Sequence, residues 1–365
     1  MRAMYVSDVG DGLCMALRTS YGETIQIDCG SQQGSDVALN GLMKFYNHLS
    51  SPDIFMLSHF HLDHYNGLML ASSRGYFPMP WEIKEVYYPK IPKFREKEEF
   101  MLCLLTMNLR VFGNETGIME YDFLKTISRI TRRSFIYKPV SKGDVINIGG
   151  TSFEVLWPPA VIDEEGTLSV IRQAINDFNI AMEADEKIKE LYQRVEKEGL
   201  FRAYFEQEQR SYSEERDDPS KLVNNEYKEK KLPDVVKKAN DSLRKAANHL
   251  SLALFEHNGL LFLGDLEKSE IRKVVNYLES VGKKRFYVFV TPHHGTHWDN
   301  CLKKIDCIYS ITSNGSKLHS HIKRGFKDIS RMSFATYVNG DIVVPPFLPT
   351  RSHRFYPWWF YDDKY

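Results

Sequence analysis

Apolar and polar positions alternate in short runs over the first third of the chain, which is typical of β-strands separated by turns. A run with helical spacing at 36–49 interrupts them, and a mixed but mostly helical pattern covers 94–130. Two β-branched runs around Gly149-Gly150 predict a hairpin at 142–159. The strands predicted before this hairpin are 2–10, 13–20, 23–31, 52–59 and 83–89.

A second group of strands begins after residue 247. Its predicted strands are 251–265, 285–295, 307–315 and 333–344, and a helix is predicted at 267–281. The two groups have a roughly similar layout and are separated by helices. Together they predict a two-layered β core with helices outside it.

The segment 160–247 differs from both groups of strands in its amino-acid composition. It is rich in Glu, Lys and Arg and nearly free of β-branched residues over most of its length. We expect a charged helical insertion or lid, made of one or two exposed helices with a solvated break at 213–221. A partner-binding arm is the alternative interpretation.

Composition narrows the function classes. The chain has 365 residues, of which 42% are hydrophobic, with 48 basic and 48 acidic side chains, so net charge offers no global field to attract nucleic acid. The five cysteines form no CxxC pair, which disfavours disulfides and a thiolate zinc site and predicts a cytoplasmic protein. The first residues resemble no signal peptide, and no run of about 18 apolar residues predicts a membrane span.

The stretch "LSHFHLDHYNGL" at 57–68 carries the clearest chemical signal. If the strand before it continues to His61, then His59 and His61 point to the same side and can bind one metal ion. Asp63 and His64 follow where the chain turns, so they are placed to bind a second ion beside the first. Imidazole and carboxylate ligands without thiolate suit zinc, and manganese is an alternative.

Other strand ends offer the remaining ligands. Asp265 follows an apolar strand and a glycine, and its carboxylate can bridge two cations; a helix N-cap is its alternative role. One of His293 and His294 should complete the second metal site. His249 is a further candidate for the first site, or else a polar residue at its edge. Asp28 is predicted to accept the free N–H of a ligand histidine and to fix its tautomer.

These motifs resemble the metallo-β-lactamase superfamily, through the HxHxDH pattern of 59–64. The order of "VSDVGDGLCMAL", "IDCG", "NHLSLAL", "LLFLGDLE" and "TPHHGT" is similar to the hydrolase domain of ComEC-type proteins. The resemblance implies a four-layer αββα sandwich with a dinuclear site between the edges of its two sheets. In that subgroup Asn248 and Ser251 would stand where other members carry a metal-binding histidine.

The resemblance covers most of 1–159 and 248–345. It implies one hydrolase domain over 1–345, interrupted by the insertion 160–247 and followed by an aromatic tail at 346–365. Two positions depart from the subgroup's pattern. Asp11 stands between the early glycines, where a small residue or glutamine is usual, and His319-Ser320-His321 replaces His-Pro-His. Membrane-channel segments are absent, so an uptake channel is not expected.

The predicted function is hydrolysis by two divalent cations that activate a water molecule. Asp63, Asp28 and His293 are the expected catalytic residues, with a protonated His293 facing the developing negative charge. A phosphodiesterase or nuclease acting on single-stranded nucleic acid is the first hypothesis. A small-molecule hydrolase of lactonase, thioesterase or phosphocholine esterase type is the second. A non-enzymatic scaffold that binds a protein partner through the insertion or the aromatic tail is the third.

Overall fold

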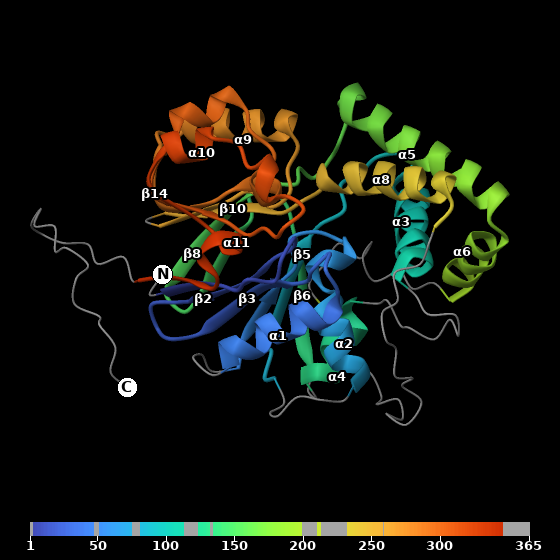
Figure 1. Cartoon of the computed structure of the whole chain (residues 1–365), viewed down its shortest axis with the longest axis horizontal. Helices are drawn as coiled ribbons and strands as arrows, with labels where there is room; N and C mark the ends of the chain where they lie inside the picture. The colour runs from blue at the N-terminus through green and yellow to red at the C-terminus, as the bar shows by residue number, and fades with distance from the viewer. Residues whose placement is uncertain are drawn as a thin grey trace, which may run out of the picture.

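Two mixed β-sheets stack face to face in the computed structural model, which describes residues 3–46, 51–74, 81–112, 123–131, 134–198, 210–212, 232–257 and 259–345 (Figure 1). The first sheet has the strand order β15-β1-β2-β3-β4-β5-β6-β9. Its neighbours from β3 to β6 are parallel and the other pairs are antiparallel. Its strands are β1 (Ala3–Val6), β2 (Cys14–Arg18), β3 (Thr24–Cys29), β4 (Ile54–Met56), β5 (Glu85–Pro89), β6 (Phe135–Val140), β9 (Arg210–Tyr212) and β15 (Ile342–Val344).

The second sheet has the order β14-β13-β12-β11-β10-β8-β7. Its neighbours from β11 to β14 are parallel, and the remaining pairs are antiparallel, including the predicted hairpin of β7 and β8. Its strands are β7 (Val145–Ile148), β8 (Thr151–Trp157), β10 (Ala253–Glu256), β11 (Leu260–Phe262), β12 (Arg285–Val290), β13 (Asp306–Thr312) and β14 (Ser330–Ala335).

Helices cover the outer face of each sheet, and buried apolar side chains fill the space between the layers. One apolar cluster lies between the two sheets, one under the helices of the first sheet, and one under α9 and α10 of the second. This is the predicted four-layer αββα sandwich. The helices are α1 (Ser35–Tyr46), α2 (Asn66–Arg74), α3 (Lys97–Phe112), α4 (Phe123–Thr131), α5 (Glu165–Ala184), α6 (Glu186–Glu198), α8 (Asp234–Asn248), α9 (Lys268–Ser280), α10 (Gly325–Asp328) and α11 (Thr336–Asn339).

Parallel strands in both sheets place polar loops at one edge of the sandwich. In the first sheet β3 and β4 lead to Asp28 and the histidine motif, and in the second β11 and β12 lead to Asp265 and His293. A backbone hydrogen bond from Leu252 N to Ser58 O, 2.7 Å long, joins the loops of the two sheets. Because the carboxyl ends of parallel strands meet at a shared edge, residues far apart in sequence come together there.

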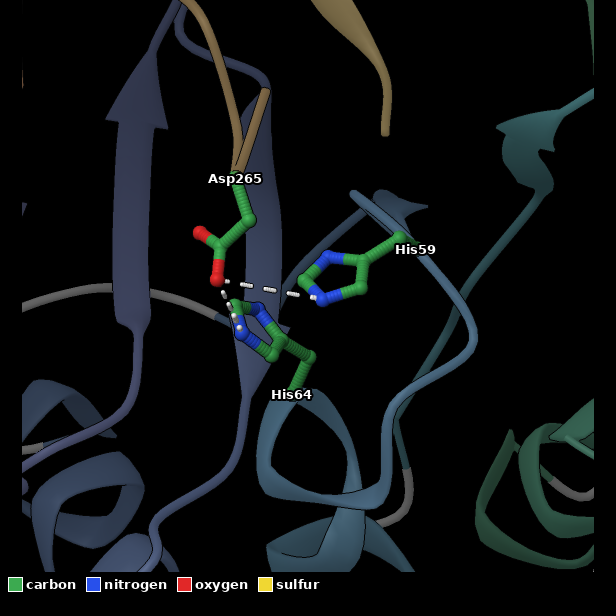
Figure 2. Close-up of side chains that lie close together, drawn as sticks. All are labelled: His59, His64 and Asp265. Carbon is green, nitrogen blue, oxygen red and sulfur yellow. Dashed lines mark ion pairs between the residues drawn. The ribbon is translucent and has the colours of Figure 1, made fainter. Parts of the chain in front are cut away.

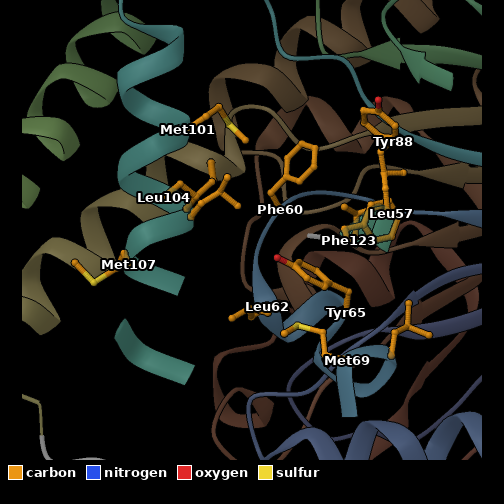
Figure 3. Close-up of a cluster of buried hydrophobic side chains, with 14 of the residues drawn as sticks. Leu57, Phe60, Leu62, Tyr65, Met69, Tyr88, Met101, Leu104, Met107 and Phe123 are labelled. Atoms are coloured by element: carbon orange, nitrogen blue, oxygen red, sulfur yellow. The ribbon is translucent and has the colours of Figure 1, made fainter. Parts of the chain in front are cut away.

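The apolar residues inside the histidine motif anchor it to the core. Phe60 and Leu62 are buried in one apolar cluster with side chains of α3, α4 and β5 (Figure 3). Asn108 of α3 donates from Nδ2 to the backbone oxygen of Phe60 at 3.1 Å. Burial of Phe60 and Leu62 therefore anchors the motif to the core.

The insertion is better packed than the sequence suggests. Its helices α5 and α8 lie against each other and against α3, and they bury apolar positions at helical spacing such as Ile171, Phe178 and Leu243. The segment was expected to form one or two exposed helices, but α5, α6 and α8 are described in it, and α5 and α8 each bury an apolar face. The predicted break at 213–221 lies outside the described residues, as does the aromatic tail at 346–365.

Three strand assignments also differ from the prediction. The segment 333–344 is not one strand: β14 ends at Ala335, α11 follows, and β15 pairs with β1 in the other sheet. Neither β6 nor β9 was predicted, and β9, which belongs to the insertion, pairs with β6. No helix in the described part of the chain has the length and apolar character needed to cross a membrane.

Asp177 joins the two helices of the insertion. It lies on α5 and accepts hydrogen bonds from Ser242 Oγ at 2.6 Å and from Lys238 Nζ at 2.9 Å, both on α8. Burial opposes the charge of Asp177, but these hydrogen bonds outweigh burial and lower its pKa. Its contribution to stability is therefore present above the unfolded-state pKa of about 3.9 and is lost as the pH falls through the lower folded-state pKa.

We expect Asp177→Asn to lower the free energy of unfolding by about 1–3 kcal/mol at pH 7, because charge-assisted hydrogen bonds are lost. Urea denaturation at a series of pH values measures this, and the difference from the wild type should shrink below about pH 4. Asp234→Asn is the matched control, since Asp234 is fully exposed and pairs only with Lys237 in the described part of the chain. A variant as stable as the wild type at pH 7 would contradict the prediction.

Candidate metal centre

The histidine motif forms a loop and a short 3-10 helix at the edge of the first sheet. β4 ends at Met56, so the strand does not continue to His61 as the sequence analysis supposed. The backbone of His61 is nevertheless extended, and His59 Nε2 lies 2.7 Å from His61 Nδ1. The two rings therefore contact each other directly. Within the described residues, however, the ligand atoms of His61 do not group with those of His59, so the predicted sharing of one metal ion stays a prediction.

Asp265 lies at the centre of the cluster. Its Oδ2 atom is 3.9 Å from His59 Nε2 and 3.6 Å from His64 Nε2, and Figure 2 shows the carboxylate pointing at both rings. The same oxygen lies 3.9 Å from His293 Nε2 and 3.6 Å from His294 Nε2. One carboxylate thus faces imidazoles from both sheets, as a bridging ligand would. Asp265 is not the N-cap of α9, its alternative predicted role, because Glu267 occupies that position.

The ligand atoms form two overlapping groups. In each group the atoms lie within 4.8 Å of one another: His59, His64 and Asp265 form one, and Asp63, His64 and His294 form the other. All of these side chains are buried. Of the two neighbouring histidines that the sequence offered for the second site, the structure brings His294 into a group.

Hydrogen bonds on the far side of two rings fix their tautomers. His64 Nδ1 lies 2.7 Å from Asp28 Oδ2, and His294 Nδ1 lies 3.0 Å from the backbone oxygen of Ser313. Because a carboxylate or carbonyl oxygen can only accept, each Nδ1 carries a proton, and each ring is held with its Nε2 atom toward the cluster. Asp28 is placed as the sequence analysis predicts, whereas the contact of Ser313 was not foreseen.

The insertion reaches the site through Arg244. Its Nη2 donates to Asp63 Oδ2 at 2.7 Å, and Gln32 Nε2 donates to the same oxygen at 2.9 Å. The other oxygen, Asp63 Oδ1, stays free to face the cluster. Sequence reasoning missed both donors. An arginine 181 positions away on a charged helix gives no signal that it reaches a histidine motif.

Residues with a strained backbone conformation lie at this site. Among the described residues other than glycine, positive φ angles occur at Asp28 (53°), His293 (48°) and His294 (55°). Such conformations cost about 1–3 kcal/mol and persist where the surroundings enforce them, often at functional sites. All three residues were predicted site residues.

Two glycines allow the chain to come this close. A Cβ atom on Gly30 would collide with the backbone of Asp63 and His64, so only glycine lets β3 approach the motif. Gly264 has φ of 49° and turns the chain directly before Asp265. The sequence pattern in which a strand is followed by glycine and aspartate therefore has a structural cause.

The charges of the buried groups are set mainly by their neighbours. Burial disfavours a charged Asp265, but His294 and His64 outweigh burial and hold its pKa well below the usual range. Burial likewise opposes ionisation of Asp63, but Arg244 and the histidines of the motif together outweigh burial and lower the pKa of Asp63. Burial lowers the pKa of His61 to about 3. The centre therefore presents two carboxylates and at least one neutral imidazole at neutral pH.

His293 differs from the predicted protonated group. Burial lowers its pKa to about 4, so its imidazole is neutral at pH 7 in these surroundings. It stacks on His297 with ring centroids 3.9 Å apart, and its Nδ1 lies 2.5 Å from Thr296 Oγ1. It also faces the cavity beside the cluster. A neutral His293 can accept a proton or a hydrogen bond there.

His249 lies outside both ligand groups, although it was a candidate for the first site. Its Nδ1 is 3.0 Å from Glu270 Oε1, a fully buried carboxylate on α9, and Trp157 Nε1 donates to its backbone oxygen at 2.7 Å. These contacts turn the ring toward α9, and it borders the cavity. Within the described part of the chain, its neighbour Asn248 has a buried Oδ1 atom with no hydrogen-bond partner.

Asp11, which departs from the subgroup's pattern, has a structural role. Its carboxylate is buried and accepts backbone N–H groups of Gly315, Lys317 and Leu318 at 2.7–3.2 Å. It thereby ties the first turn of the chain to the loop before His319 and His321, which belong to neither ligand group within the described residues.

A cavity of about 980 Å³ lies beside the cluster. Gln32, His293 and His294 form its inner wall, whereas Thr167 and Val170 of α5 and Arg244 of α8 form part of its outer wall. Its volume is near the upper end of the range for small-molecule sites. The insertion therefore helps to form the space in which a substrate would lie.

The residues present fit a pair of divalent cations. Four donor atoms, Asp63 Oδ1 and the Nε2 atoms of His61, His64 and His294, are buried with no hydrogen-bond partner in the described part of the chain. Buried polar atoms normally have a hydrogen-bond partner, so a cluster of buried atoms without one needs an explanation. Metal coordination supplies one, because it uses these lone pairs.

Fold and site thus define a chain with an αββα sandwich and a cluster of metal-ligand type at its edge. No family model matches the sequence, and no curated protein matches it. Solved structures similar to it include the metallo-β-lactamase fold protein YhfI from Bacillus subtilis, 8% identical, covering 93% of this chain and 99% of that chain with a TM-score of 0.40. A diphosphatase of the PhnP family is 11% identical and covers 95% and 99% with a TM-score of 0.39.

A variant of the metallo-β-lactamase FEZ-1 from Legionella gormanii is a shorter match. It is 18% identical and covers 42% of this chain, with a TM-score of 0.25. The chain spans 49% of the length of that enzyme. The named neighbours share the metallo-β-lactamase fold, and the assignment of chemistry depends on the residues described above.

Proposed function

We propose that this chain is a metal-dependent hydrolase that cleaves phosphodiester bonds with two divalent cations. The observation that carries the proposal is the convergence of buried, unpartnered donor atoms around Asp265. The donors are carboxylates and imidazoles without thiolate, a set that favours zinc and also accepts manganese. His59 and His61 would hold the first cation, Asp63, His64 and His294 the second, and Asp265 both.

The cations, when bound, supply activation of water and polarisation of a phosphoryl oxygen. The protein's own groups position the reaction. Asp28 and the Ser313 carbonyl would orient His64 and His294 with Nε2 toward the cations, and Gln32 and Arg244 would orient Asp63. His293, neutral and at the cavity wall, is placed to accept a proton from the attacking water or to hydrogen-bond the substrate.

The resemblance to the ComEC-type hydrolase subgroup supports a phosphodiester substrate, including single-stranded nucleic acid. The five cysteines are free thiols, which supports a reducing compartment such as the cytoplasm. We favour a hydrolase over a pure scaffold because the donor set is complete. A protein partner would then use the insertion or the tail at 346–365, and the tail lies outside the described residues.

The cavity favours a second candidate, a hydrolase of small esters such as lactones, thioesters or phosphocholine esters. Helices α5 and α8 form part of its wall, and a volume of about 980 Å³ suits a ligand of nucleotide size or smaller. This candidate uses the same metal centre. Only the preference between polymer and small substrate separates it from the first.

A substrate panel with the metal-loaded protein tests the proposal. We expect the wild type to hold two equivalents of zinc or manganese by elemental analysis and to cleave bis(p-nitrophenyl) phosphate or single-stranded DNA or RNA. Asp63→Ala should lower that rate by about 10²-fold or more, because a metal ligand is lost. Cleavage of lactones or thioesters alone would favour the second candidate, and a metal-loaded protein inactive on the whole panel would overturn both.

A further inference from the structure

Arg244 is the cation lining the cavity that directly contacts the metal-ligand cluster. It lies in the last half of α8, and its side chain is 28% exposed, between Asp63 on one side and the cavity on the other. A guanidinium has five N–H donors in a fixed fork. Within the described part of the chain, one of them is used, by the hydrogen bond from Nη2 to Asp63. The others remain available toward the cavity.

We propose that Arg244 binds a non-bridging oxygen of an anionic phosphoryl substrate, so that the insertion supplies part of the substrate site. The inference rests on the proposed function, because it assumes cations at the cluster. It adds to that function a specific residue and a class of substrate: a phosphoester that keeps a negative charge while it is bound. Planar donor forks suit phosphate oxygens, which is why arginine is common where phosphate is recognised.

Charge balance supports this assignment. Two divalent cations held by Asp63 and Asp265, with neutral imidazoles as the other ligands, leave a net charge of about +2 at the centre. A guanidinium beside such a centre is repelled unless an anion joins them. Gln32 already donates to the same oxygen of Asp63, so a neutral group can hold this carboxylate in place. The positive charge of Arg244 is therefore best explained by an anionic ligand.

The other charged side chains around the cavity do not replace Arg244. Lys245, Lys268 and Lys323 also line it, but none of them contacts the cluster in the described part of the chain. Glu164, Asp241 and Glu267 lie on the same walls and offset those lysines. The lysines are thus offset by carboxylates, whereas Arg244 is the cation that lies against the metal-ligand cluster. Affinity for phosphate should therefore depend on Arg244 more than on general basicity.

Binding of inorganic phosphate to the zinc-loaded full chain tests the inference. Arg244→Gln keeps an N–H donor for Asp63 and removes the charge, Arg244→Ala removes both, and Lys237→Ala removes an exposed charge on the same helix. Isothermal titration measures phosphate affinity, and elemental analysis measures bound zinc. We expect both Arg244 variants to keep two zinc equivalents and to bind phosphate at least about tenfold more weakly. Lys237→Ala should bind phosphate as the wild type does.

Two results would overturn the assignment. Wild-type phosphate affinity in Arg244→Gln would show that the charge is not used for the ligand. Loss of zinc together with phosphate binding in Arg244→Gln would show that Arg244 only positions Asp63. The substrate panel keeps the proposed function separate. Phosphate binding that depends on Arg244 in a protein that cleaves no phosphoester would overturn the proposed function, and phosphoester cleavage with phosphate binding independent of Arg244 would overturn this inference alone.

Discussion

Replacing Asp265 by alanine should remove bound metal and lower hydrolysis by about 10³-fold or more. Its Oδ2 atom faces four imidazole nitrogens from both sheets at 3.6–3.9 Å, so it is placed to carry negative charge toward both cations. Without Asp265, less negative charge would lie between the two cations, and they would repel each other more strongly. Loss of several kcal/mol of metal-dependent stabilisation corresponds to the stated factor.

Elemental analysis and initial rates on the preferred substrate measure the effect. Asp265→Asn keeps the size of the side chain and removes the charge, so it serves if the alanine variant folds poorly. Asp306→Asn is the matched control, because Asp306 lies on β13 of the same sheet with its side chain 64% exposed. Two retained metal equivalents with full activity in Asp265→Asn would refute the bridging role.

Asp28→Asn should weaken metal binding by about 10–100-fold while leaving the fold intact, the usual cost of losing a hydrogen bond that orients a ligand. The carboxylate accepts from Ser58 N at 2.7 Å and from His64 Nδ1 at 2.7 Å. Asparagine can still accept from Ser58 with its oxygen, but its amide nitrogen then faces His64 as a donor. The ring must respond by carrying its proton on Nε2, the atom needed for the metal.

The backbone at position 28 makes this substitution a clean test. Its φ angle is 53°, a conformation that asparagine tolerates as well as aspartate does. Asp53→Asn is the matched control, since Asp53 accepts a backbone N–H from Thr24 at the opposite end of β3. Zinc titration against a competing chelator gives the affinity, and urea denaturation reports the fold. Unchanged zinc affinity in Asp28→Asn would mean that His64 does not depend on Asp28 for its tautomer.

Much of the site could be predicted because its chemistry is local in the sequence. His59, His61, Asp63 and His64 lie within six positions, and alternation of side chains sends Phe60 and Leu62 into the core. Asp265, His293 and His294 each follow an apolar strand. Polar residues at the ends of strands lie in loops, and loops held by a rigid scaffold often carry the functional residues of a protein. His249 was misplaced because sequence cannot tell which side of a helix end faces the site.

The insertion was the least predictable part of the fold. Its charged residues dominated the composition, although an apolar stripe on α5 and α8 decides how those helices pack. The short strand β9 pairs with β6 through backbone hydrogen bonds. A strand of three residues is too short for its residue pattern to predict it. The position of β15 in the first sheet likewise depends on pairing with β1, in which Val6 lies opposite Ile342, 336 positions further along the chain.

The sequence by itself determined the kinds of atom available and most of the strands that carry them, because residue type and periodicity are properties of short segments. Tertiary structure alone decided which of those atoms share one space. Asp265 lies beside the histidine motif, and His294 rather than His293 belongs to a group of ligand atoms. Arg244 reaches Asp63 only because the two sheets stack and α8 packs beside them. Distances across a fold depend on all the packed layers together, and no local pattern contains them.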